Sequence, residues 1–317
     1  MRVLVCPDKF AGTLSAVEAA DAIAAGWARA RPDDQVARMP LSDGGPGFID
    51  VLRANLGGTL HEVTVTDPLG RPVSALWLEH DGTAYLEAAQ ANGLALLTPE
   101  ERDPWRASTR GVGQLIADAM PLPIVIGLGG SATNDGGRGA VEELAGARPD
   151  LTIATDVDSP LLGPQGATYG FARQKGATDL AVLEQRMQQW AAQDPALAEQ
   201  PGAGAAGGLG FGLMLLGGHR VSGIETVAQA VGLAGACAHA QLVITGEGKV
   251  DWQSLHGKVL SGVLATSSKV IVLAGQVDDV PDLTAYSLLD FAGDAAFTDP
   301  AGALADLAAD VARAYLA

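Results

Sequence analysis

The 317-residue sequence predicts an α/β fold with two α/β domains: a Rossmann-like parallel-sheet domain, interrupted by an inserted domain with a mixed sheet. Strand-like and helix-like segments alternate near both ends of the chain, as in parallel sheets. From about residue 60, apolar and polar residues alternate singly, which indicates antiparallel hairpins. We expect residues 1–60 and 240–317 to form the first domain and 61–239 the second, with the active site in the cleft between them.

The first domain is expected to begin with two strand-loop-helix units, and Ser15 is the predicted N-cap of the first helix. After the inserted domain, the same rhythm returns and a helix closes the chain. The expected strands are 2–6, 35–40, 241–245, 269–274 and, weakly, 285–289, and the expected helices are 15–30, 48–56, 256–265 and 302–316.

The inserted domain is expected to open with three antiparallel strands, joined by turns rich in Asp and Gly. Strands and helices then alternate as they do in the first domain. The expected strands are 61–66, 73–78, 84–88, 123–127 and 151–155, and the expected helices are 109–120, a segment ending at 144, and 180–193.

Charge and composition exclude several classes of protein. The chain has 37 acidic and 20 basic residues, so its net charge of −17 offers no general attraction to nucleic acids or anionic membranes. No apolar stretch approaches the roughly 20 residues of a membrane-spanning helix. The two cysteines lie far apart and no secretory signal follows Met1, so we expect a cytoplasmic protein.

A glycine-rich stretch between a predicted strand and a predicted helix is the strongest functional signal. It runs from 127 to 137 as Gly-Leu-Gly-Gly-Ser-Ala-Thr-Asn-Asp-Gly-Gly. Consecutive glycines let backbone amides close around an anion, and Ser131, Thr133 and Asn134 add polar groups beside them. The simpler alternative is a tight crossover in which Asn134 or Asp135 caps the helix.

Part of this stretch, Gly127-x-Gly129-x-x-Ala132, also matches the dinucleotide-binding fingerprint, with Asp150 and Asp156 further along. A dinucleotide-dependent oxidoreductase acting on a hydroxy acid is therefore an alternative. The fingerprint alone is a weak signal, and it leaves the polar residues after Ala132 unexplained. No Walker A sequence occurs in the chain.

A second group of candidates follows the predicted strand at 241–245. Glu247 and Asp251 can hold Mg²⁺ or accept a hydroxyl proton, whereas Lys249 and Lys258 can neutralise phosphate oxygens. Ligands of open α/β sheets gather at the carboxyl ends of the strands, where this segment lies. The alternative is a solvated charged loop.

The loops after the first two predicted strands carry Asp8, Lys9 and Asp43. Because neighbouring parallel strands end at the same edge of a sheet, we expect these loops to meet. Asp43 is a candidate general base or metal ligand, and its alternative role is a helix N-cap.

The inserted domain carries two further candidates. Asp156 and Asp158 follow the strand at 151–155 and can bind a divalent cation through oxygen or simply turn the chain. Lys175 lies in a polar, glycine-containing loop, and a cation there in so acidic a chain indicates a local anion site.

Taken in order, these segments resemble the type-1 glycerate kinase family, the bacterial glycerate kinases that lack a Walker A loop. The likeness covers almost the whole chain, and departs from the family at Ala11, where Lys is common, and at Pro46, where Glu is common. The matching motifs are Pro-Asp-x-Phe-x-Gly-x-Leu-Ser-Ala at 7–16, Asp-Gly-Gly at 43–45, Gly-Gly-Ser-Ala-Thr-Asn-Asp-Gly-Gly at 129–137, Asp-Val-x-x-Pro-Leu-x-Gly-Pro at 156–164, Gln-Lys-Gly-Ala at 174–177, Gly-Ala-Ala-Gly-Gly-Leu-Gly at 204–210 and Ile-Thr-Gly-Glu-Gly-x-x-Asp-x-Gln at 244–253, followed by Gly257-Lys258.

The resemblance implies ATP-dependent phosphorylation of a hydroxyl of glycerate, giving 2- or 3-phosphoglycerate and ADP, with Mg²⁺ as cofactor. The two departures keep open a kinase for another short hydroxy acid, or a non-catalytic sensor that keeps the fold and binds ligand, and the oligomeric state stays open. Recognition of the substrate carboxylate would fall to Ser131, Asn134 or Lys175. Together with the candidates above, the expected roles are catalysis for Asp43, Glu247, Asp251 and Lys258, substrate or nucleotide binding for Asp8, Lys9, Gly129, Gly130, Ser131, Thr133, Asn134, Asp135 and Lys175, and metal binding for Asp156 and Asp158.

Overall fold

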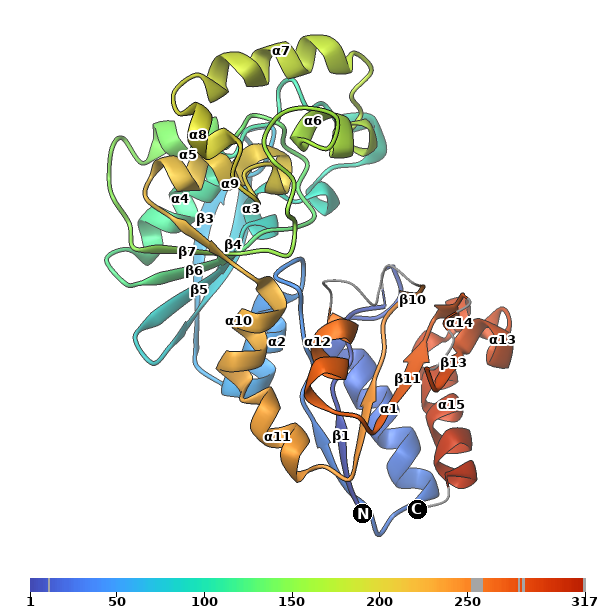
Figure 1. The fold of residues 1–317 in the computed structure, drawn as a ribbon. Helices are drawn as coiled ribbons and strands as arrows, with labels where there is room; N and C mark the ends of the chain where they lie inside the picture. The colour runs from blue at the N-terminus through green and yellow to red at the C-terminus, as the bar shows by residue number, and fades with distance from the viewer. Residues whose placement is uncertain (11, 252–258, 279, 281–282, 316–317) are drawn as a thin grey trace. The chain divides into compact units, whose positions relative to one another are not determined.

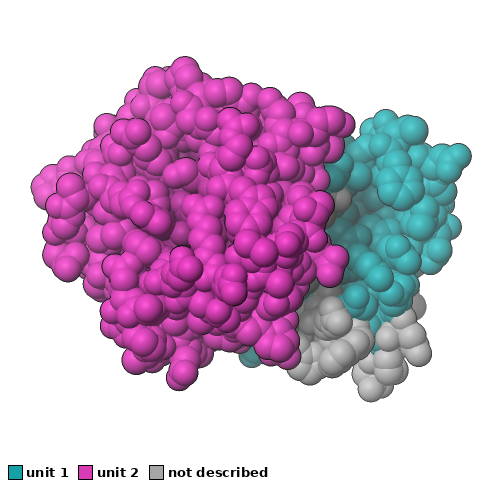
Figure 2. Space-filling view, turned by 90° about the horizontal axis from the view of Figure 1, so that it is seen from above, with its two compact units in different colours: residues 1–43, 50–56, 224–317 teal, residues 44–49, 57–223 magenta. Residues whose placement is uncertain are grey.

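The computed structural model describes residues 1–10, 12–251, 259–278, 280 and 283–315. It is an α/β structure built mainly on a five-stranded parallel sheet and a six-stranded mixed sheet, and a parallel and a mixed sheet are what the sequence predicts (Figure 1). Two compact units are present (Figure 2): unit 1 is Met1–Asp43, Asp50–Leu56 and Ile224–Ala317, and unit 2 is Gly44–Ile49 and Gly57–Gly223.

Unit 1 is built on a parallel sheet in the order β13-β11-β9-β1-β2. The order reverses at β1, because β2 lies on one side of it while β9, β11 and β13 follow on the other. Open α/β sheets bind ligands beyond the carboxyl ends of the strands at such a reversal. The strands are β1 (Arg2–Val5), β2 (Gln35–Arg38), β9 (Leu242–Thr245), β11 (Val270–Ala274) and β13 (Ala285–Ser287), and β10 (Lys249–Val250) pairs with β12 (Gln276–Val277) in a small second sheet.

Helices cover both faces of this sheet. Alternate strand residues such as Val5 and Ile244 pack against α1 and α15, whereas Val272 and Ala274 belong to a separate apolar cluster with Leu260 of α12. Ser15 caps α1, as predicted, in a capping box with Glu18. The helices are α1 (Ala16–Ala30), α2 (Phe48–Leu56), α10 (Gly223–Val231), α11 (Leu233–His239), α12 (Val259–Thr266), α13 (Leu288–Ala292), α14 (Ala295–Thr298) and α15 (Pro300–Ala314).

The chain returns to unit 1 at Ile224, earlier than the expected boundary near 240. The reason is that α10 and α11, which the sequence pattern did not reveal, form part of unit 1. Helix α11 packs against β1 and α12 of that unit. The expected helix at 256–265 begins at Val259 within the described residues, and residues 252–258 lie outside them.

Unit 2 is built on a six-stranded sheet in the order β3-β4-β5-β6-β7-β8. The first three strands are antiparallel hairpins, and the pairs from β5 to β8 are parallel. The carboxyl ends of β5 to β8 therefore meet at one edge. The strands are β3 (Thr59–Thr66), β4 (Pro72–His80), β5 (Thr83–Glu87), β6 (Ile124–Gly127), β7 (Leu151–Ala154) and β8 (His219–Val221).

The helices of unit 2 enclose its core, to which α4, α5 and α9 contribute buried apolar residues such as Leu115, Ala140 and Phe211. No helix among the described residues is both long and apolar enough to cross a membrane. The helices are α3 (Ala89–Asn92), α4 (Arg110–Ala119), α5 (Arg138–Glu143), α6 (Ala167–Phe171), α7 (Leu180–Ala191), α8 (Pro195–Ala198) and α9 (Ala205–Leu215), with single 3-10 turns at Leu94–Leu96, Pro99–Glu101 and Arg173–Lys175.

Candidate active site

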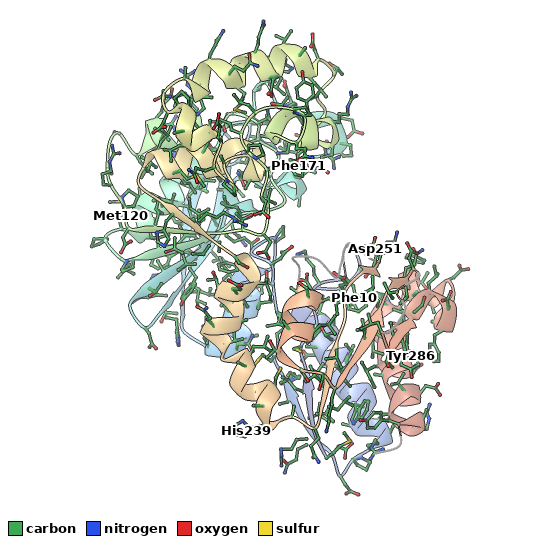
Figure 3. The ribbon with its side chains drawn as sticks, viewed as in Figure 1. Phe10, Met120, Phe171, His239, Asp251 and Tyr286 are labelled. Atoms are coloured by element: carbon green, nitrogen blue, oxygen red, sulfur yellow. The ribbon has the colours of Figure 1, made fainter. Side chains whose placement is uncertain are left out.

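In unit 1, the loops after β1, β2 and β9 are tied together at the carboxyl edge of the sheet. The amide of Asp8 donates to the carbonyl oxygen of Gly246 at 2.8 Å, and the amide of Leu41 donates to that of Pro7 at 2.9 Å. Figure 3 shows Phe10 and Asp251 at this end of the unit, opposite His239. The loops after the first two strands therefore meet, as expected, and the loop after β9 joins them at the point where the strand order reverses.

These loops bring Asp8, Lys9, Asp43 and Glu247 into one cluster. Lys9 Nζ lies 3.7 Å from Asp8 Oδ1 and 3.3 Å from Asp43 Oδ1, so one cation bridges two carboxylates. Burial raises the pKa of Asp8 to about 7; repulsion from Asp43 and Glu247 acts in the same direction, and Lys9 opposes it. Within the described residues, three acidic side chains and one lysine thus lie together at this edge of the sheet.

Asp251 follows the short strand β10, near a different lysine. Lys249 Nζ lies 2.8 Å from Asp278 Oδ2 and 3.9 Å from Asp251 Oδ2. Lys249 is therefore engaged by Asp251 and by Asp278, which follows the neighbouring strand β12. Lys258 and Ala11 lie outside the described residues.

In unit 2, the glycine-rich loop follows β6, where the sequence placed it. Gly130 has a φ of +61°, and a Cβ atom there would lie 2.6 Å from Cγ of Pro46. A Cβ atom at Gly129 would lie 2.7 Å from Cα of Gly45. The loop therefore needs glycine at both positions because the segment around Pro46 packs directly against it.

The ammonium group of Lys175 lies inside this loop. Its Nζ donates to Ser131 Oγ at 2.8 Å and to the carbonyl oxygen of Thr133 at 2.7 Å. Only 2% of the residue is exposed. Burial lowers the pKa of Lys175 to about 7, and the nearby charge of Asp135 opposes this shift. Three sequence candidates, Ser131, Thr133 and Lys175, thus form one hydrogen-bonded group.

A pocket of about 260 Å³ opens beside this group. Apart from Ser131 and Lys175, its polar lining comes from Gln174 and loop backbone, while apolar side chains form the rest of its wall. Phe171, labelled in Figure 3, is one of these. The lining also includes Leu94, Leu128, Gly129, Gly130, Val157, Ala206 and Gly207.

Asn134 and Asp135 face other parts of unit 2 and do not line this pocket. Asn134 Nδ2 donates to Thr168 Oγ1 at 3.3 Å, and the residue is buried. The carboxylate of Asp135 accepts hydrogen bonds from the amides of Gly137 and Gly139, each at 3.1 Å. The N-cap residue of α5 is Gly137 and not Asn134 or Asp135, although Asp135 accepts from the amide of Gly139 in the first turn of that helix.

Asp156 and Asp158 each have a separate partner. Asp156 Oδ1 accepts from Ser222 Oγ at 2.8 Å and from the amide of Gly223 at 2.9 Å. Asp158 Oδ1 lies 2.6 Å from a guanidinium nitrogen of Arg220. Throughout the described part of the chain, no three His, Cys, Asp or Glu side chains are grouped so that they could hold a metal ion.

Sequence reasoning missed three residues that shape the loop. Thr109 donates to Asp135 Oδ2 through both its amide and its hydroxyl, each at 2.9 Å. The backbone carbonyl oxygen of Asn92 accepts from the amide of Ala132 at 2.8 Å. The carboxylate of Glu87 accepts from the amide of Gly47, in the segment around Pro46, at 2.9 Å. Thr109 and Glu87 had a sequence signal, as polar residues at a predicted helix start and strand end. Asn92 had none.

Known proteins resemble this chain along most of its length. The model of the glycerate kinase family matches residues 3–150 and 145–315. An uncharacterized protein of Mycobacterium bovis is 46% identical over 98% of this chain and 91% of its own length. The glycerate 2-kinase of Escherichia coli is 38% identical over 88% of this chain and 86% of its own length. A crystal structure assigned to a glycerate kinase 2 of Salmonella typhimurium superposes with a TM-score of 0.79 and 32% identity, over 99% of this chain and 98% of that one. The chain therefore belongs to the glycerate kinase family of enzymes.

Proposed function

We propose that this chain transfers the terminal phosphoryl group of ATP to a hydroxyl of glycerate, giving 2- or 3-phosphoglycerate and ADP. The names of its relatives support glycerate as the acceptor. The observation that carries the proposal is the convergence of Lys175 and Ser131 on a small pocket beside the glycine-rich loop.

The hydrogen bonds of this pair leave donors for an anion. An ammonium group has three N–H donors, and among the described residues Lys175 uses two, toward Ser131 and Thr133. Because the charged form of Lys175 can only donate, Ser131 Oγ accepts in their bond, and its own O–H can donate to a ligand. One N–H and one O–H are thus available to the carboxylate of a small hydroxy acid, as charge-assisted hydrogen bonds.

The acidic cluster of unit 1 suits the other half of the chemistry. Mg²⁺ is commonly held by one or two carboxylates together with nucleotide phosphates, so it does not need the three-ligand group that the described residues lack. Asp8, Asp43 and Glu247 have the oxygen ligands that this ion prefers, and their mutual repulsion would be relieved by a cation. When bound, Mg²⁺ would neutralise charge on the phosphate oxygens.

Phosphoryl transfer needs mainly positioning and charge neutralisation from the protein. In the proposed reaction, Lys175 and Ser131 orient the acceptor by its carboxylate, and backbone amides of the glycine-rich loop bind anionic oxygens. A carboxylate of the acidic cluster or Asp251 accepts the proton of the attacking hydroxyl.

The oxidoreductase alternative receives no support from the loop. In the dinucleotide fingerprint the glycines open directly into the helix whose N-terminus faces the pyrophosphate. Here β6 ends at Gly127 and α5 begins only at Arg138, with the bonded segment around Ser131 and Asp135 in between.

The test is release of ADP from Mg²⁺-ATP with D-glycerate, L-glycerate, glycerol or no acceptor, with phosphorus NMR of the product. We expect one glycerate enantiomer to be phosphorylated and glycerol to be inert, because glycerol lacks the carboxylate that Lys175 would bind. Release with lactate or another short hydroxy acid in place of glycerate would instead identify a changed acceptor. Release that no acceptor stimulates would reject the kinase assignment.

A further inference from the structure

The carboxylate of Asp135 accepts four hydrogen bonds from donors of the protein. Its Oδ2 accepts from the amide of Thr109, the hydroxyl of Thr109 and the amide of Gly139, and its Oδ1 accepts from the amide of Gly137. A carboxylate offers about four lone-pair sites, two on each oxygen, so these bonds saturate Oδ2 and use one site of Oδ1. Most of the hydrogen-bonding capacity of Asp135 therefore serves to hold the loop and Thr109 together.

The hydroxyl of Thr109 has a fixed orientation in this network. The amide of Ala140 can only donate, and it points at Thr109 Oγ1 from 3.1 Å. The threonine oxygen therefore accepts from Ala140 and must direct its own proton at Asp135. Thr109 is completely buried, so water cannot replace either bond.

This network fixes one end of the segment that faces the acceptor pocket. Ser131, Thr133 and Asp135 are close in sequence, and the first two hold the ammonium group of Lys175. At the other end, the amide of Ala132 donates to the carbonyl oxygen of Asn92. The short segment 131–134 is thus held on both sides, by Asn92 and by Asp135 with Thr109.

We infer that Thr109 and Asp135 are a positioning pair, which holds segment 131–134 and Lys175 in the arrangement that binds the acceptor carboxylate. This inference rests on the proposed function of the pocket. The negative charge of Asp135 also favours the charged form of Lys175, which is the form that binds an anion. Thr109 acts one step further from the ligand, through Asp135.

The test compares Thr109→Val, Thr109→Ser and the control Thr66→Val in the full chain. Valine keeps the shape of threonine but removes the hydroxyl, whereas serine keeps the hydroxyl. Thr66 lies in the same unit, and its hydroxyl bonds Gln114 at 3.2 Å, away from the pocket. For each variant, kcat and KM for glycerate and for ATP are measured together with the thermal midpoint.

We expect Thr109→Val to lower kcat/KM for glycerate at least tenfold while KM for ATP changes less than about twofold. Thr109→Ser should restore kcat/KM to within about threefold of the wild type, and Thr66→Val should leave it unchanged. The inference is overturned if Thr109→Val merely lowers the thermal midpoint and the folded enzyme keeps its kcat/KM for glycerate.

The test also covers a variant that does not fold and a wild type that does not use glycerate. If Thr109→Val does not fold, Asp135→Asn takes its place, because it removes the charge and one acceptor oxygen while keeping the volume, and the same loss of kcat/KM for glycerate is expected. If the wild type shows no glycerate-dependent ADP release, the proposed function fails. Amide hydrogen exchange of residues 128–139 then decides: faster exchange in Thr109→Val than in Thr66→Val supports the positioning pair, and equal exchange overturns it.

Discussion

The Nζ atom of Lys175 lies 2.7 Å from the carbonyl oxygen of Thr133, which places a buried cation inside the glycine-rich loop. Burying a charge is costly unless it is paired and hydrogen-bonded. This ammonium group is hydrogen-bonded by neutral oxygens, and the carboxylate of Asp135 influences it through space. A cation that the fold leaves without a directly bonded anion is well suited to receive one from a ligand.

Replacing Lys175 should therefore impair use of the acceptor more than use of ATP. We expect Lys175→Met to lower kcat/KM for glycerate about 10- to 100-fold, the range for loss of a hydrogen bond to a charged group. KM for ATP should change little. The matched control is Lys269→Met, which removes an exposed lysine. A fall in kcat/KM for ATP alone would show that Lys175 serves the nucleotide instead.

The stability of the protein should depend on pH through the same residue. In the folded chain the pKa of Lys175 is about 7, below its ordinary value of 10.5. Between these values the unfolded chain binds more protons than the folded chain, so the free energy of unfolding should rise as the pH rises from about 7 toward 10. Urea unfolding at pH 7 and pH 9 measures this rise.

Lys175→Met supplies the comparison, because every other titrating group is unchanged. The rise in the free energy of unfolding between pH 7 and pH 9 should be smaller in the variant than in the wild type. An identical rise in both proteins would mean that Lys175 keeps an ordinary pKa in the folded state.

Asp43 offers a test of the acidic cluster in unit 1. Its Oδ1 lies 3.3 Å from Lys9 Nζ, and its charge contributes to the raised pKa of Asp8. We expect Asp43→Asn to raise the Mg²⁺ concentration for half-maximal ADP release about tenfold, which corresponds to ~1.4 kcal/mol of binding energy. Asp21→Asn is the control, since Asp21 pairs with Arg38 on an exposed surface of the same unit.

Removing Mg²⁺ with a chelator should abolish ADP release in the wild type, and excess Mg²⁺ should restore it. If Asp43→Asn instead lowers kcat at saturating Mg²⁺ without changing the Mg²⁺ requirement, Asp43 accepts the hydroxyl proton and does not hold the ion. The measurement thus separates the two roles that the sequence left open for this residue.

Much of the fold could be predicted because the local patterns of apolar and capping residues in the sequence agree with the burial in the structure. Ser15 caps α1 as expected, since its side chain meets the amide of Glu18 in a capping box. Helix α11 was missed because Ala and Gly make up most of its sequence and carry little periodicity, whereas α10 was overlooked although its apolar residues recur at helical spacing. A strand pattern likewise cannot show which strands become neighbours, so the reversal of order at β1 emerged only from the structure.

Side-chain partners were harder to predict than the motifs that contain them. The glycine-rich stretch was located correctly, but Ser131 turns toward the pocket while Asp135 turns toward Thr109. These directions depend on backbone torsions within the loop and on contacts with residues remote in sequence. Lys175 was a candidate because it is a cation in a polar, glycine-containing loop of a strongly acidic chain. Its burial among oxygen atoms of the glycine-rich loop could be seen only in the tertiary structure.

Gly207 provides a final prediction, because it lies where the loop, Lys175 and helix α9 meet. A Cβ atom at this position would lie 1.9 Å from the carbonyl oxygen of Thr133 and 2.9 Å from Lys175 Nζ. Its φ of +71° also disfavours a side chain. Gly207→Ala should therefore break the bond between Lys175 and Thr133, lower the thermal midpoint and reduce kcat/KM for glycerate.

Gly232→Ala separates these two effects. Gly232 has nearly the same φ, +72°, but a Cβ atom there meets no atom within 4 Å. This control should cost only the backbone strain of a left-handed alanine, about 1–2 kcal/mol, and should leave kcat/KM for glycerate intact. Gly207→Ala should cost clearly more, because the backbone oxygen of Thr133 cannot move away without displacing the loop. Equal losses of stability in both variants, with unchanged kinetics, would show that the loop tolerates displacement and that its contact with Lys175 is dispensable.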